Sequence, residues 1–287
     1  MTNTTEILID GLTFTEAPRW HEGRLYFSDF FTHQVLAVDT KGQLETIVKT
    51  PYQPSGLGWL PDGSLLIVSM NDQKLLRFNN GELTEAADLS TLANHYCNDM
   101  VVDRNGNAYI GNFGFDLHGG ESLKPTNLIL VRPDEDPCVV ADNLFFPNGT
   151  VITPDGKTLI LGETFSSCLT AFDINSDATL SNRRVWADLS AIEEDYVPVP
   201  DGICLDAEGA IWVASPSTND VIRIEEGGSL LDKIEVDMGA FACMLGGEKG
   251  NTLFISTAKD SQEEICLREK SARIETVEVN IPRAGLP

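Results

Sequence analysis

Short runs of apolar residues recur along the chain, and each run begins two or three residues after a glycine. Runs this short, bounded by turn residues, are typical of β-strands rather than of helices. Successive turn glycines lie 40, 43, 50, 53 and 41 residues apart, which indicates one structural unit repeated six times. These glycines are Gly23, Gly63, Gly106, Gly156, Gly209 and Gly250, and the runs start at Leu25, Leu65, Ala108, Leu159, Ile211 and Leu253.

Further segments with β character follow most of these runs, for example residues 34–38, 128–131 and 221–224. Long amphipathic helical periodicity is absent from the chain. Six units of four antiparallel strands predict an all-β fold, a six-bladed β-propeller that forms a single domain over residues 1–287. We expect the early strand at residues 6–9 to join the last blade beside residues 274–279 and close the ring.

One position in each unit stands where the innermost strand of a blade enters the central channel. It lies eight residues before the turn glycine, or seven in the first unit, where the turn is tighter. Five of the six positions carry an oxygen-bearing side chain, although residues facing a crowded axis should be small or apolar. The six residues are Glu16, Ser55, Asn98, Asn148, Asp201 and Ala242.

Two interpretations of this polar ring stay open. Glu16, Asn148 and Asp201 offer two carboxylates and one amide oxygen, with Asn98 as a further candidate, and such ligands suit a hard divalent cation. Ca²⁺ is the expected ion, with Mn²⁺, Mg²⁺, Zn²⁺ and Fe²⁺ as alternatives, although histidines and cysteines show no zinc-ligand spacing. The other interpretation is a channel of polar side chains hydrogen-bonded to ordered water.

The charge balance bears on possible partners. Lys and Arg number 20 against 44 Asp and Glu, which gives a net charge of −24. A surface this acidic repels nucleic acid and anionic membranes, so neither is an expected partner. The start of the chain shows no signal peptide, and the six cysteines form no CxxC pair. We therefore expect a cytoplasmic protein with reduced, buried thiols, and the oligomeric state stays open.

Long loops gather on the face where the innermost strands begin. Residues 112–126 follow a second strand, and residues 93–97 and 193–200 precede first strands. Loops over a polar channel suggest a substrate pocket with a lid. Arg19 near the channel either binds an acidic group or forms a structural ion pair, and the four tryptophans are expected in the blade core.

Several segments together resemble the regucalcin/gluconolactonase family over nearly the whole chain. The resemblance implies a six-bladed propeller with one divalent cation held by Glu16, Asn148 and Asp201. It also implies that Asn98 contacts metal-bound water or substrate and that Asp201 is the general base. The segments are residues 15–20, 98–99, 147–149 with 153–159, 200–203 with 206–209, and 242–247 with 252–254.

The expected function is metal-dependent opening of a lactone, with Asp201 as the catalytic residue and Asn98, Tyr96, Phe113 and Asp116 as substrate-binding candidates. Sugar-lactone members of the family usually carry arginine where this chain has Tyr96. The aromatic character there suggests a less polar lactone or ester. Two alternatives use the same residues: a phosphotriesterase or fluorophosphatase-like hydrolase, and a non-enzymatic calcium- or ligand-binding propeller.

Overall fold

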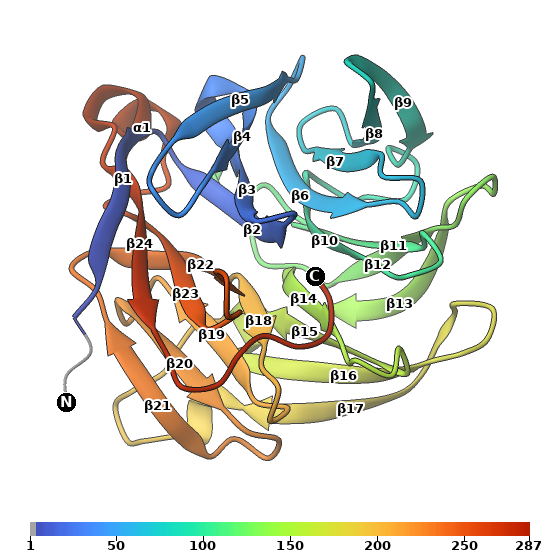
Figure 1. Cartoon of the computed structure of the whole chain (residues 1–287). Coiled ribbons are helices and arrows are strands. Elements are labelled where there is room, and N and C mark those ends of the chain that lie inside the picture. The colour runs from blue at the N-terminus through green and yellow to red at the C-terminus, as the bar shows by residue number, and fades with distance from the viewer. Residues whose placement is uncertain (1–3) are drawn as a thin grey trace.

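Six four-stranded antiparallel sheets surround a central channel in the computed structural model, which describes residues 4–287 (Figure 1). The predicted six-bladed propeller is therefore confirmed. All six turn glycines adopt φ between 72° and 89°, a backbone conformation that glycine reaches without a side-chain clash. The repeat spacing thus marks the hairpins between the first and second strands of the blades.

Each of the first three blades runs outward from the axis in chain order. Blade 1 contains β2 (Thr15–His21), β3 (Arg24–Asp29), β4 (Gln34–Val38) and β5 (Leu44–Lys49). Blade 2 contains β6 (Pro54–Trp59), β7 (Leu65–Ser69), β8 (Lys74–Asn79) and β9 (Glu82–Asp88). Blade 3 contains β10 (Cys97–Val102), β11 (Ala108–Asn112), β12 (Thr126–Val131) and β13 (Cys138–Leu144).

The last three blades follow the same order, except that the sixth takes its outer strand from the start of the chain. Blade 4 contains β14 (Pro147–Ile152), β15 (Thr158–Glu163), β16 (Cys168–Ile174) and β17 (Leu180–Asp188). Blade 5 contains β18 (Ile203–Leu205), β19 (Ile211–Ser215), β20 (Asp220–Ile224) and β21 (Leu230–Glu235). Blade 6 contains β22 (Gly239–Gly246), β23 (Thr252–Ala258), β24 (Ala272–Glu278) and β1 (Glu6–Leu12).

Strand β1 pairs antiparallel with β24, with Glu6 opposite Thr276, so the expected closure of the ring is confirmed. A short helix, α1 (Glu263–Glu269), connects β23 to β24 and was not expected from the sequence. Three single 3₁₀ turns occupy Phe30–Thr32, Thr164–Ser166 and Leu189–Ala191. No helix within residues 4–287 is long and apolar enough to cross a membrane.

Burial decreases from the axis to the rim. Every residue of β7, β11 and β19 is buried, because neighbouring blades cover the inner strands on both faces. In contrast, β9 at the rim has no buried residue and only two half-buried ones. The core is thus a set of apolar layers between blades, and polar side chains near the axis are the exception that needs explaining.

The cysteines and tryptophans test two further expectations. All six cysteines are free, with four buried and two half-buried, in agreement with reduced thiols. Trp186 and Trp212 are buried in the core as expected. Trp20 and Trp59 are only half-buried, so their placement in the blade core was wrong. Both lie at the turn end of their strands.

Candidate active site

A β-bulge in the innermost strand positions the ring residues. In the first strands of five blades the register with the second strand shifts at or directly after the ring position. A bulge adds one residue to a strand and redirects a side chain, here towards the channel. In blade 1 the bulged residue is Ala17, whose φ of 50° is unusual for a residue other than glycine.

The strand register assigns the ring position of blade 6 to a different residue from the one expected. Ala240 pairs with Thr257 just before the bulge, as Pro147 pairs with Glu163 just before the ring residue of blade 4. The Gly202 backbone N–H donates to the Phe241 carbonyl, as that of Gly149 donates to the ring residue Asp201, so Phe241 holds the ring position. Ala242, the residue expected by counting, lies one position further along the strand. The count failed because the turn of blade 6 is longer. Neither phenylalanine nor alanine has a side-chain oxygen, so blade 6 contributes no oxygen ligand by side chain.

Glu16 and Asp201 converge at one end of the channel. Glu16 is buried, and Asp201 keeps part of its surface exposed. Burial, followed by repulsion from Asp201 and Asp99, raises the pKa of Glu16 well above its usual range. Burial also raises the pKa of Asp201 to about 8, with Asp99 adding to the effect and a hydrogen bond from Asn148 opposing it. Negative charge is therefore unfavourable on both acids, and a cation bound between them would offset that cost.

The two asparagines lie at the same end of the channel and are both buried. The Asn148 side-chain nitrogen donates to the Thr164 hydroxyl at 3.2 Å, which leaves its carbonyl oxygen without a donor among the described residues. The Asn98 side-chain nitrogen donates to the Pro147 carbonyl at 3.3 Å and connects blade 3 to blade 4. Each amide therefore presents an oxygen that a cation or a substrate hydroxyl can use.

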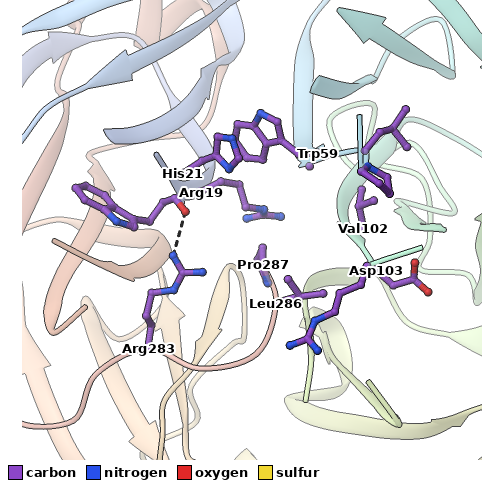
Figure 2. Close-up of a pocket in the computed structure, with 13 residues that line it drawn as sticks. Arg19, His21, Trp59, Val102, Asp103, Arg283, Leu286 and Pro287 are labelled. Carbon is purple, nitrogen blue, oxygen red and sulfur yellow. Dashed lines mark hydrogen bonds between the residues drawn. The ribbon is translucent and has the colours of Figure 1, made fainter. Parts of the chain in front are cut away.

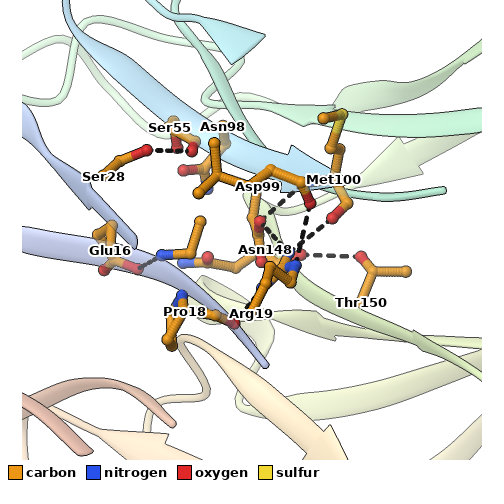
Figure 3. A network of polar contacts seen from close by, with 12 residues as sticks. Glu16, Pro18, Arg19, Ser28, Ser55, Asn98, Asp99, Met100, Asn148 and Thr150 are labelled. Atoms are coloured by element: carbon orange, nitrogen blue, oxygen red, sulfur yellow. Dashed lines mark hydrogen bonds and ion pairs between the residues drawn. The ribbon is translucent and has the colours of Figure 1, made fainter. Parts of the chain in front are cut away.

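Arg19 forms a structural ion pair, which resolves the alternative left open by the sequence. Its guanidinium donates to the Asp99 carboxylate at 2.6 Å and to the backbone carbonyls of Leu57, Met100 and Pro18 (Figure 3). Both charged side chains are nearly inaccessible to solvent. Because Asp99 and three carbonyls occupy this guanidinium, Arg19 lowers the pKa of Glu16 less than any other neighbouring group affects it.

The chemistry of this donor set fits a hard divalent cation. Within residues 4–287, no three or more histidine, cysteine, aspartate or glutamate side chains are arranged to hold a metal. A cation here would instead rest on the two carboxylates of Glu16 and Asp201 together with amide oxygen. That combination suits Ca²⁺, Mg²⁺ or Mn²⁺ better than zinc, and two negative charges balance a divalent ion.

Aromatic side chains surround the same end of the channel. Phe14, Tyr96 and Phe146 each lie two residues before a ring position, so they occupy the entrance of their strands. The Phe113 ring packs against Phe146 at a centroid distance of 4.3 Å and against Tyr96 at 6.0 Å. The Phe14 ring packs edge-on against Phe241 at 4.7 Å.

We call this set the aromatic mouth. Most of its members belong to one hydrophobic cluster that draws on blades 1, 3, 4 and 6. Aromatic side chains gathered beside the candidate ligands favour an apolar ligand over a polyhydroxylated one. The aromatic mouth comprises Phe14, Phe30, Phe31, Tyr96, Phe113, Phe115, Phe146, Phe165 and Phe241.

Asp116 does not join the other candidates. Its exposed side chain accepts a hydrogen bond from the Gly119 backbone at 2.7 Å and lies 4.0 Å from His95. It thus fixes the turn of its own loop. Its role in substrate binding stays a prediction, whereas Tyr96 and Phe113 lie within the aromatic mouth.

Sequence reasoning missed Asp99 and most of the aromatic mouth. Asp99 directly follows the ring residue Asn98, and its acidic character beside a ring position was the available signal. Its partner Arg19 lies 80 residues away in the chain, so the pair was not readable from spacing. For the aromatic mouth, the available signal was an aromatic residue that recurs two residues before Glu16, Asn98 and Asn148.

Comparison with known proteins points to one family. The family described as SMP-30/Gluconolactonase/LRE-like region matches residues 14–259. Regucalcin of Xenopus laevis is 25% identical over 256 residues, which are 87% of this chain and 84% of the relative. The 6-deoxy-6-sulfogluconolactonase of Pseudomonas putida is 25% identical over 285 residues, 95% of this chain and 93% of the relative. A pentonolactonase of Haloferax volcanii is 26% identical over 263 residues, 88% and 84% respectively.

Solved structures share the architecture. A calcium-binding regucalcin of Agrobacterium tumefaciens superimposes with a TM-score of 0.82 at 19% identity, over 100% of this chain and 97% of that one. A gluconolactonase of Xanthomonas campestris gives a TM-score of 0.75 at 23% identity, over 96% of this chain and 89% of that one. Identities this low establish the propeller fold alone.

Proposed function

This chain belongs to the SMP-30/gluconolactonase/LRE-like family, and from that premise we propose that it is a divalent-metal-dependent hydrolase that opens a lactone ring. The observation that carries the proposal is the convergence of Glu16 and Asp201, neither of which forms an ion pair within residues 4–287. Relatives named as lactonases support the reaction type. A relative described as calcium-binding supports Ca²⁺ as the ion.

Glu16, Asn148 and Asp201 hold the cation in this proposal. When bound, the cation polarises the lactone carbonyl and stabilises the negative charge that develops on its oxygen. Asp201 takes a proton from the attacking water as general base. Asn98 orients the substrate through its free amide oxygen.

The aromatic mouth supports a substrate less polar than a sugar lactone. Tyr96 stands two residues before Asn98, and its ring contacts Phe113 rather than offering a charged group to hydroxyls. A lactone with an alkyl or aryl substituent would bury that substituent among the rings and gain about 25 cal/mol for each Å² of apolar surface removed from water. Hydroxyl groups in the same position would lose their hydrogen bonds to water.

A lactone panel assayed with Ca²⁺, Mn²⁺ or Mg²⁺ tests the proposal. We expect kcat/KM for δ-nonalactone to exceed that for glucono-δ-lactone by about tenfold or more. Asp201→Asn should lower turnover by about 100-fold or more. The matched control Asp237→Asn, whose side chain is 93% exposed, should leave turnover unchanged.

Four outcomes would contradict parts of the proposal. Near-wild-type turnover by Asp201→Asn would remove that residue from the chemistry. Tight Ca²⁺ binding without turnover of any lactone would favour a binding protein, and faster hydrolysis of an aryl phosphotriester would favour a phosphotriesterase. A preference for gluconolactone would refute the apolar substrate alone. Tyr96→Arg should shift the preference towards gluconolactone, since it places a charged donor in the aromatic mouth.

A further inference from the structure

A cavity lies at the end of the channel opposite the candidate active site, where the hairpin turns are. It encloses about 260 Å³ between the ends of β2, β6 and β10 and the tail that follows β24 (Figure 2). The tail crosses this face and ends near the centre of the ring (Figure 1). Backbone hydrogen bonds fix the tail, including a mutual pair between Leu286 and Ile152. The cavity is therefore a formed feature of the fold.

Two arginines without acidic partners line this cavity. The chain has 11 arginines, and nine of them form an ion pair within the described residues. The two that form none in residues 4–287 are Arg104 and Arg283, and both border the cavity. In a chain with 44 acidic residues, this coincidence at one place indicates a site for an external anion.

Arg283 is held in place with spare donor capacity. One terminal nitrogen donates to the Trp20 carbonyl at 3.1 Å, and this is its single side-chain hydrogen bond within the described residues (Figure 2). Burial lowers the pKa of Arg283, yet a guanidinium stays charged at neutral pH. A partly desolvated charge with unused donors gains more from an anion than a solvated one does.

The Asp103 carboxylate on the cavity wall already accepts hydrogen bonds from its own loop. Asp103 accepts hydrogen bonds from the Asn105 backbone at 2.8 Å and from the backbone and side chain of Asn107 at 2.9 and 2.8 Å. Arg19 also borders the cavity, but Asp99 neutralises it. Asp103 keeps its negative charge, as does the terminal carboxylate of Pro287, which also lines the cavity, but within residues 4–287 neither forms an ion pair with an arginine. The guanidinium groups that remain free to pair with a ligand are therefore those of Arg104 and Arg283.

Aromatic rings form the rest of the wall. The His21 ring stacks on Trp59 at a centroid distance of 3.9 Å and an interplanar angle of 12°. Burial lowers the pKa of His21, so this imidazole is neutral at neutral pH and stacks as an uncharged ring. Trp20 stacks on Phe254 at 5.3 Å. Half-buried rings beside two guanidinium groups suit a flat apolar body that carries one negative charge.

We propose that this cavity binds a small aromatic carboxylate. A carboxylate matches the paired donors of a guanidinium, and a single ring with its carboxylate is a suitable size for about 260 Å³. Inorganic phosphate would use the arginines and leave the rings without a partner. The site is independent of lactone hydrolysis, since it shares no side chain with the proposed metal ligands.

Calorimetric titration of the whole chain with benzoate tests the site, with benzamide as the uncharged analogue of the same shape. We expect saturable binding of one benzoate, at least about tenfold tighter than benzamide. The same affinity is expected with Ca²⁺ and with a chelator, because a carboxylate bound at the metal ligands would require the ion. Inorganic phosphate should bind more weakly than benzoate.

Variants assign the binding to the two arginines. Arg283→Gln should weaken benzoate binding by about tenfold or more, and Arg104→Gln by about three- to fivefold because that side chain is exposed. Arg268→Gln on α1, where the arginine pairs with Glu269, should bind as wild type does. If Arg283→Gln does not fold, Arg104→Gln decides.

Four results would overturn the proposal. These are equal affinity for benzoate and benzamide, loss of benzoate binding in chelator, phosphate binding as tightly as benzoate, and wild-type affinity in both Arg104→Gln and Arg283→Gln.

Discussion

Replacing Asp201 by asparagine should stabilise the metal-free protein at neutral pH, although it removes a proposed cation ligand. Surrounding protein raises the pKa of Asp201 from 3.8 to about 8. A carboxyl with a raised pKa binds its proton more tightly in the folded state than in the unfolded state. The wild type therefore loses stability as the pH rises from about 4 towards 8, and asparagine has no proton to lose.

The size of the effect follows from the interval between the two pKa values. One pKa unit corresponds to about 1.36 kcal/mol, so the interval from 3.8 to pH 7 gives an upper value of about 4 kcal/mol. Asp201 keeps some exposure, and its titration is linked to that of Glu16, so the full value is not realised. We expect the variant to gain about 2 kcal/mol at pH 7.

Urea unfolding of chelator-treated protein at pH 5, 6, 7 and 8 measures this gain. The free-energy difference between Asp201→Asn and wild type should widen with each step in pH. The control Asp237→Asn should follow the wild type, because its side chain is 93% exposed. A difference that stays constant with pH, or a wild type that is more stable than the variant at pH 7, would refute the reasoning.

Three further predictions concern the same end of the channel. Ca²⁺ at 100 times its Kd should stabilise the wild type against thermal unfolding by about 2.7 kcal/mol but should not stabilise Glu16→Gln. Equal stabilisation of both proteins would place the ion elsewhere. Asp99→Asn should lower the free energy of unfolding in urea by about 3 kcal/mol, since it leaves the buried Arg19 charge unpaired. A decrease of less than about 1 kcal/mol would contradict this prediction. Gly149→Ala should lower the free energy of unfolding by about 2 kcal/mol, because a Cβ there lies 2.5 Å from the backbone of the next blade. In the control Gly162→Ala the Cβ lies 3.2 Å from a side chain, so the loss should be smaller. The reverse order of the two losses in urea unfolding would refute this prediction.

Short-range patterns in the sequence were enough to predict the fold. The turn glycines need positive φ, and this backbone requirement repeats with every blade, so their spacing located all six hairpins. The ring residues were readable for the same reason in five blades. The sixth was misplaced by one residue, because a longer turn moved the glycine relative to Phe241.

Features that depend on contacts between blades were not readable. Arg19 and Asp99 meet because blade 1 and blade 3 both face the axis, and no spacing in the chain encodes that distance. Trp20 and Trp59 look like core residues by composition, and only the course of the tail makes them the wall of a cavity. Helix α1 has seven residues, too few for a periodic pattern to stand out.

The Arg19 side chain reaches across a third of the ring. It starts on β2 and ends on carbonyls of β6 and β10 and on Asp99, all of them buried. We expect this bridge to divide the channel into two chambers with no passage between them. Under the proposed function, the lactone, water and the hydroxy acid product would then all enter and leave through the aromatic mouth. Acid product that remains bound there would prevent the next lactone from binding. We therefore expect the acid to be a competitive inhibitor of lactone hydrolysis.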